Sequence, residues 1–111
     1  LPAGATVVGG YFAAEDLDSN ATEEVDIDIG WAANGTEAAD PDGFGNFGVL
    51  TGDAVTGYKP EGGTILPLAG KLITDGPVSF SDETIIEGDV NVDAATFAAG
   101  RVTVVIYYHT A

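Results

Sequence analysis

Apolar and polar residues alternate along several segments of this chain, which is the pattern of half-buried β-strands. The clearest example is 24–31. Its apolar positions, which we expect to face a core, are Val25, Ile27, Ile29 and Trp31. Its remaining positions, which we expect to face solvent, are Glu24, Asp26, Asp28 and Gly30. A strict period of two excludes an amphipathic helix here and predicts a strand with one face in the core.

Further strands are indicated between clusters of Gly, Pro, Asp and Asn. We expect them at 6–12, 64–74, 78–80 and 84–92, with a short candidate at 47–50. In 84–92 the residues expected to face inward are Ile86, Val90 and Val92. Residues 32–46 are expected to form a loop, and 93–100 a helical turn or an extended loop with Phe97 as a plug. Short strands without a long helix predict one all-β domain over 1–111, an antiparallel β-sandwich or jelly roll.

The segment 101–109 is apolar on both faces. One face holds Val102, Val104, Ile106 and Tyr108, and the other holds Thr103, Val105, Tyr107 and His109. Because a strand that is apolar on both faces is usually covered twice, we expect it at the centre of a sheet or at a subunit seam. We predict that the first face packs the sandwich. The residues predicted at a subunit or capsid interface are Gly9, Gly10, Val105 and Tyr107. The paired glycines also indicate a bulge or the close approach of another backbone.

The charge of the chain narrows its partners. Eighteen Asp and Glu against three Lys and Arg give a net charge of −15 over 111 residues. Nucleic acids and anionic membrane surfaces repel such a chain, so we expect neither as a partner. The charge serves solubility, or it faces a basic partner surface or bound cations. With 45% hydrophobic residues in a regular pattern, we do not expect disorder.

The sequence shows neither cysteine nor a segment with the pattern of a membrane span or a signal peptide. There is no Cys, which excludes disulfides and thiolate sites. No run approaches the ~18 apolar residues of a membrane span, and no signal peptide is visible. Because the sequence begins at Leu1, without Met, we expect a processed chain or one that lacks its first residues.

Two acidic segments have the residue types of calcium loops. Residues 16–20 open as D-x-D-x-N, but Ala21 and Ile27 stand where an EF-hand needs Gly and Glu, which excludes an EF-hand. The residues of a looser calcium site are Asp16, Asp18, Asn20 and Glu23. A second candidate loop is 40–43. We favour a turn-forming role for both, since Asp and Asn bond their own backbone in turns, and expect no cofactor.

No motif in the chain indicates an enzyme. His109 is the only histidine, and no G-x-S-x-G nucleophile turn accompanies it. Among eighteen acids no pair is marked as flanking a sugar cleft, and the Gly-rich stretch 43–48 lacks the Lys of a phosphate loop. Trp31 is in phase with the core positions, whereas Tyr58 lies in a loop. If either aromatic stacked on sugar, the chain would be a carbohydrate- or receptor-binding module, such as a head fibre or bacterial surface domain.

An ordered series of segments resembles small proteins that tailed bacteriophages encode among their head genes. The segments are 1–10, 16–19, the acidic strand to Gly30, 82–88, 94–100 and the Val-rich final strand. The chain is similar to capsid decoration (cement) or minor head proteins. The resemblance implies a non-enzymatic virion protein on the capsid exterior, bound to the major capsid protein. Such proteins often carry basic residues in the first segment, where this chain has Ala3 and Thr6, so its contact with the shell must differ.

The charge of the chain agrees with a location outside the capsid, and its final strand agrees with an oligomeric virion protein. Packaged DNA would repel a protein of charge −15 within the Debye length of ~8 Å, whereas the same charge outside keeps particles soluble. The apolar final strand indicates self-association, and we expect a homo-oligomer, a dimer or a trimer.

Overall fold

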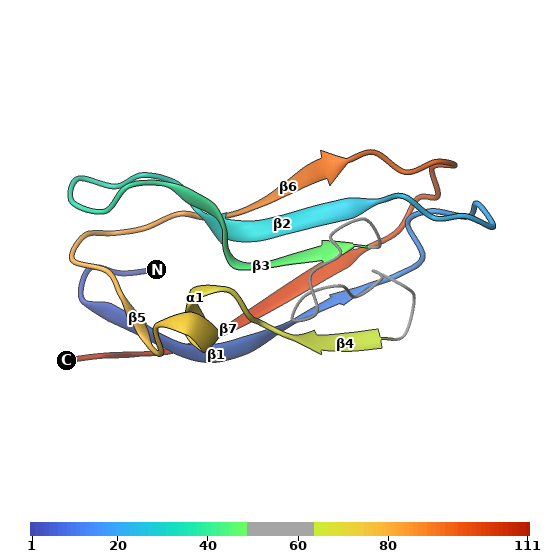
Figure 1. The fold of residues 1–111 in the computed structure, drawn as a ribbon. Coiled ribbons are helices and arrows are strands. Elements are labelled where there is room, and N and C mark those ends of the chain that lie inside the picture. Colours follow the sequence, from blue (N-terminus) through green and yellow to red (C-terminus); the bar gives the residue numbers. More distant parts are fainter. Residues whose placement is uncertain (49–63) are drawn as a thin grey trace.

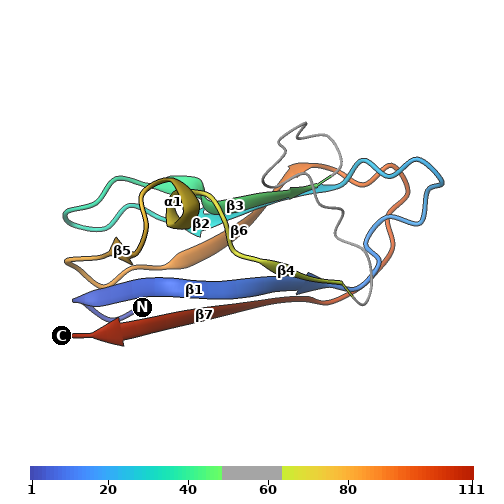
Figure 2. The same cartoon turned by 60° about the horizontal axis from the view of Figure 1, so that its bottom comes forward.

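The chain folds into two antiparallel β-sheets that pack face to face (Figures 1 and 2). This computed structural model describes residues 1–48 and 64–111. Its strands are β1 (Ala5–Ala14), β2 (Asp26–Trp31), β3 (Asp40–Gly48), β4 (Thr64–Pro67), β5 (Val78–Ser79), β6 (Ile86–Val92) and β7 (Val102–Thr110), with one short helix, α1 (Lys71–Thr74). The predicted all-β class is confirmed, and the architecture is that of a sandwich.

Strand β1 is the centre of the first sheet. β7 pairs with it from Ala5 to Ala14 on one edge, while β4 and β5 share the other edge. The second sheet has the order β3-β2-β6. Of the two positions expected for the final strand, the centre of a sheet is wrong, because among the described residues β7 pairs with β1 alone and lies at an edge. The subunit seam stays a prediction. Of the face expected to pack the sandwich, Val104 and Ile106 lie against the core, whereas Val102 and Tyr108 remain 40% and 47% exposed.

Aromatic side chains from both sheets meet in the core. Phe12 of the first sheet stacks on Phe47 of the second, with ring centroids 4.5 Å apart. Trp31 lies edge-on to Phe44 and Phe80, at 4.9 and 5.0 Å. The inward positions predicted for β2 are all buried, namely Val25, Ile27, Ile29 and Trp31. The alternation read from the sequence therefore places β2 correctly against the core.

Strand β3 occupies 40–46 of the loop expected at 32–46, whereas 32–39 form a loop as expected. The glycines of β3 are required by the side chains that lie over them. A Cβ atom on Gly43 would stand 2.2 Å from the indole ring of Trp31, and one on Gly48 would stand 2.6 Å from Oδ1 of Asp26. The composition that is typical of a loop thus reflects packing against β2. Residues 49 and 50 of the short strand candidate lie outside the described residues.

The strand expected at 64–74 ends at Pro67, and the chain then crosses between the sheets. The Leu68 amide donates to the Gly10 carbonyl at 3.1 Å, and the Ala69 amide donates to the Phe44 carbonyl at 2.8 Å. Helix α1 follows and contacts β3 (Figure 2). This segment closes one flank of the sandwich, because its backbone is bonded to both sheets.

The segment between β6 and β7 is extended, and Phe97 is not the expected plug. Its side chain is 81% exposed. Val90 was expected inside and is 60% exposed. Both side chains lie at the flank between β6 and β7, where the part of the chain that the structure describes does not enclose them. Among the described residues no helix is long and apolar enough to span a membrane.

Candidate interaction surfaces

The outer face of the first sheet, the side turned away from the second sheet, carries no charged side chain along its paired strands. The register places Tyr11 between Val105 of β7 and Pro67 of β4, and Gly9 opposite Tyr107. Alternation then assigns to this outer face Thr6, Val8, Gly9, Tyr11, Ala13, Ile65, Pro67, Ser79, Thr103, Val105, Tyr107 and His109. In a chain of charge −15, none of the acidic residues in the described strands lies on this face.

The outer face is apolar as well as uncharged. Val8, Ile65 and Tyr107 are each more than half exposed, at 51%, 68% and 53%. The rings of Tyr11 and Tyr107 meet edge to face, with centroids 6.4 Å apart. Exposed apolar side chains gathered on one face mark interaction sites more often than isolated ones do. The outer face is therefore the leading candidate for an interface.

Three of the four predicted interface residues lie on this outer face. Gly9, Val105 and Tyr107 are neighbours across the β1–β7 pairing. Gly10 instead allows the two backbones to approach, since a Cβ atom there would stand 2.1 Å from the Val105 carbonyl oxygen. The pairing register shifts between Val7 and Gly9. The bulge and the close approach predicted from the paired glycines are both confirmed.

The second sheet presents the opposite surface. Asp28 of β2 lies between Asn46 of β3 and Asp89 of β6, and its carboxylate accepts a hydrogen bond from the Asn46 amide. Burial raises the pKa of Asp28; the hydrogen bond from Asn46 opposes this, while nearby carboxylates add to the rise. Those carboxylates are Asp26, Asp42 and Asp89. The two exposed sheet faces therefore differ sharply in charge.

Gly30 and Asp26 were both expected in solvent and are instead buried. Asp26 has only 3% of its surface exposed. Asn91 donates to its Oδ2 at 3.4 Å. Gly48 lies directly beside it on β3 and leaves it room. The side chain is covered because the neighbouring strands crowd around it, which alternation along β2 alone cannot show.

The Asp18 carboxylate is the centre of a hydrogen-bonded junction between two connecting segments. Its two carboxylate oxygens accept backbone N–H groups from Asn20, Glu24, Val25, Ala95 and Thr96. Burial raises its pKa, but these hydrogen bonds outweigh burial and hold the pKa of Asp18 well below its usual range. The carboxylate thereby joins the β1–β2 connection to the β6–β7 connection.

Two other members of the first calcium candidate, Asp16 and Asn20, accept backbone N–H groups two residues further along the chain. Asp16 accepts the Asp18 amide at 3.0 Å, and Asn20 accepts the Thr22 amide at 2.9 Å. A carboxylate has about four lone-pair sites, so Asp18 would have to give up backbone bonds to bind a cation. The calcium site of Asp16, Asp18, Asn20 and Glu23 stays a prediction.

The second calcium candidate, 40–43, lies in β3. Burial raises the pKa of Asp40, the neighbouring Asp42 carboxyl raises it further, and the Lys71 amine opposes both. Lys71 Nζ lies 3.6 Å from the Asp40 carboxylate. Across the described ranges 1–48 and 64–111, no three His, Cys, Asp or Glu side chains are grouped as a metal site would require.

The remaining candidates of the sequence are placed as follows. His109 is exposed near the end of β7, opposite Thr6. Trp31 is 4% exposed, and its indole N–H donates to the Ala38 carbonyl at 3.1 Å. Its ring is therefore unavailable for stacking on a sugar. Tyr58 lies outside the described residues.

Comparison with known proteins adds no relative. The chain matches no protein-family model, no curated protein and no solved structure. Its function is therefore argued from its own surfaces.

Proposed function

We propose that this protein is a non-enzymatic capsid decoration protein of a tailed bacteriophage, bound to the major capsid protein on the outside of the shell. The observation that supports this most is the separation of charge between the two sheets. Along the described strands the outer face of the first sheet holds no acidic residue, whereas the second sheet carries several. If this face were always in contact with solvent, we would expect acidic residues on it as on the second sheet.

The outer face supplies the binding free energy in this proposal. Burying apolar area contributes about 25 cal/mol per Å², so exposed residues such as Val8, Ile65 and Tyr107 favour contact with an apolar patch of the shell. Such contact needs no basic residue on this chain. A ligand that binds only the assembled shell stabilises that shell by mass action.

The acidic second sheet then points away from the shell. Its carboxylates keep decorated particles apart and soluble, and they stay distant from packaged DNA. Self-association as a dimer or a trimer uses the same outer face in this proposal, with Val105 and Tyr107 at the seam. The alternative function, a carbohydrate-binding module, is less well supported because Trp31 is buried in the core and cannot stack on a sugar.

Co-sedimentation with shells that lack the protein tests the proposal. Because the contact is apolar, we expect wild-type protein to pellet with shells and to remain bound at high salt. A protein that stays in the supernatant at every salt concentration would contradict the proposal.

A further inference from the structure

One flank of the sandwich is left open by the described residues, 1–48 and 64–111. The segment from Leu68 to α1 closes the opposite flank by bonding both sheets. On the open flank lie the two edge strands β6 and β7, which in the described ranges pair only with β2 and β1 respectively and not with each other. Each edge strand leaves a row of backbone N–H and C=O groups without a partner strand.

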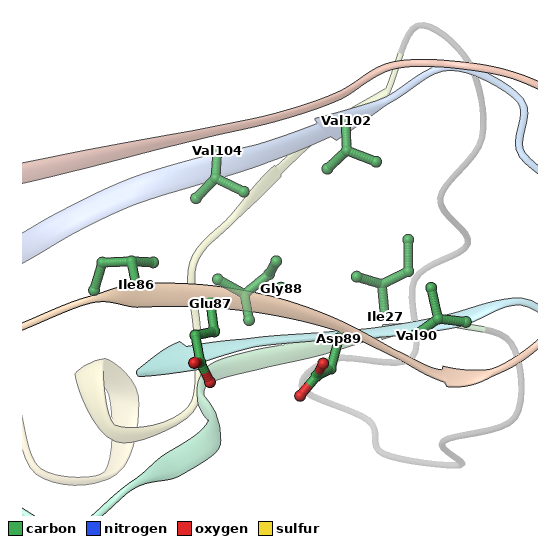
Figure 3. A pocket seen from close by; sticks show the side chains of 9 residues that line it. Ile27, Ile86, Glu87, Gly88, Asp89, Val90, Val102 and Val104 are labelled. Atoms are coloured by element: carbon green, nitrogen blue, oxygen red, sulfur yellow. The ribbon is translucent and has the colours of Figure 1, made fainter. Parts of the chain in front are cut away.

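An apolar groove runs between these edge strands. Two adjoining cavities of about 300 and 400 Å³ share Ile27, Val90 and Val102 as lining residues. Figure 3 shows Val102 and Val104 of β7 facing Ile86, Gly88 and Val90 of β6 across the first cavity. The second cavity extends the groove to the end of the sandwich where Leu17 and Phe97 lie.

The groove lacks a side chain at its middle. Gly88 occupies an inward position of β6, opposite Ile29 of β2. A Cβ atom on Gly88 would come within 3.3 Å of Ile29 Cδ1 and would meet no other atom closer than 4.0 Å. Space therefore remains above Gly88 for an apolar side chain from another molecule, and Val90 beside it stays exposed for want of a cover.

The other face of β6 is acidic. Glu87 and Asp89 also line the first cavity, and Figure 3 draws both carboxylates on the side of β6 turned away from Val102 and Val104. A strand added to the free edge of β6 would set alternate residues into the groove and the others beside these carboxylates. Opposite charges across neighbouring strands stabilise a pair, and like charges destabilise it.

We propose that the free edge of β6 accepts an extended segment of a partner protein in which apolar residues alternate with Lys or Arg. The segment adds as a strand to the second sheet, fills the groove above Gly88, and pairs its basic residues with Glu87 and Asp89. Strand addition of this kind takes affinity from backbone hydrogen bonds and specificity from alternate side chains.

A second copy of this chain does not fit the site. The whole chain has three basic residues, Lys59, Lys71 and Arg101, and none lies in an alternating apolar and basic run. The described strands of a second copy would bring carboxylates, or no charge, beside Glu87 and Asp89, and so would form no attractive charge pair there. This surface is also separate from the outer face of the first sheet, so the two proposals stand or fall independently.

The test is an NMR titration of the purified protein with a capped seven-residue peptide, the length of β6, that alternates Val and Lys. We expect backbone amide signals of β6 and methyl signals of Ile86, Val90 and Val102 to shift, and amide exchange in β6 to slow. The same peptide with Glu in place of Lys is expected not to bind. Asp89→Lys should weaken binding about fivefold, since an attractive cross-strand pair becomes repulsive.

Two variants make the test specific. Asp75→Lys makes the same charge change beside α1 on the closed flank and should weaken binding less than about twofold, since exposed charges contribute little. Gly88→Val fills the groove and should abolish peptide binding while the protein stays folded. The proposal is overturned by equal binding of the Glu peptide, by shifts confined to the outer face, by pairing between copies at β6, or by no shift at millimolar peptide.

Discussion

The backbone of Gly10 passes so close to Val105 that a Cβ atom on Gly10 would stand 2.1 Å from the Val105 carbonyl oxygen. Gly10 also has a φ of 154°, which L side chains rarely adopt. We therefore expect Gly10→Ala to lower the free energy of unfolding by about 2 kcal/mol or more in urea titration. At Gly9 a Cβ atom would only touch Tyr107 at 3.8 Å, so Gly9→Ala should cost under about 1 kcal/mol. Equal stability of the two variants would contradict this β1–β7 register.

Asp18→Asn tests the junction between the β1–β2 and β6–β7 connections. An amide turns one acceptor oxygen into a donor that faces backbone N–H groups, so we expect a clear fall in melting temperature at pH 7. Asp16 accepts a single backbone N–H, and Asp16→Asn should have a much smaller effect.

The same carboxylate gives the protein a dependence on acid. Because the pKa of Asp18 is lower in the folded than in the unfolded state, its stabilisation is complete above the unfolded pKa of about 4 and is lost as the pH falls below it. Wild-type protein should therefore lose stability between about pH 5 and pH 2 more steeply than Asp18→Asn. Parallel curves for the two proteins in urea titrations would show that Asp18 does not carry this linkage.

Asp28 has the opposite effect on how stability depends on pH. Burial and neighbouring carboxylates raise its folded pKa, so its charge destabilises the fold at pH 7, and that penalty disappears as the pH falls through the folded pKa. Asp28→Asn keeps an acceptor for Asn46 and should stabilise the protein by up to about 1 kcal/mol at pH 7, with a smaller gain at pH 4. Asp75→Asn is the control and should change little, because the exposed Asp75 carboxylate lies 3.8 Å from the Lys71 amine and such surface pairs contribute little to stability. A destabilised Asp28→Asn at pH 7 would argue against crowding on this sheet.

Tyr107→Asp and Val105→Asp test the outer face. Each puts a charge where the face has none, and Tyr107 is already half exposed, so we expect Tyr107→Asp to keep its melting temperature within a few degrees. Self-association, measured by sedimentation equilibrium, and shell binding should both fall at least tenfold. Ile73→Asp, at an exposed position of α1 away from the outer face, should leave both unchanged. Intact association and binding in both outer-face variants would mean that this face serves no interface.

The core-facing side of β2 could be predicted because its period of two is uninterrupted. β3 could not, because its glycines are explained by Trp31 and Asp26 of the neighbouring strand rather than by their own sequence. The prediction of a central position for β7 is wrong for a related reason. Apolar residues on both faces are compatible with a central strand and equally with an edge strand on a sheet whose outside is apolar.

The candidate surfaces were predictable only in part. Alternation placed Val105 and Tyr107 on one side of the final strand, but only the pairing with β1 and β4 shows that the whole outer face is uncharged. The groove left no sequence signal, since Val90 and Val102 have the pattern of core residues whether or not a partner covers them. A single glycine in a strand, such as Gly88, does not by itself indicate a groove.

The proposed decoration function is tested most directly by the copy number of this protein in purified particles of the phage that the proposal expects to encode it, measured by quantitative mass spectrometry against the major capsid protein. A decoration protein should be present in a fixed ratio to the capsid subunits, and so in many copies per particle. Its absence from particles, or its presence in only a few copies, would contradict the account.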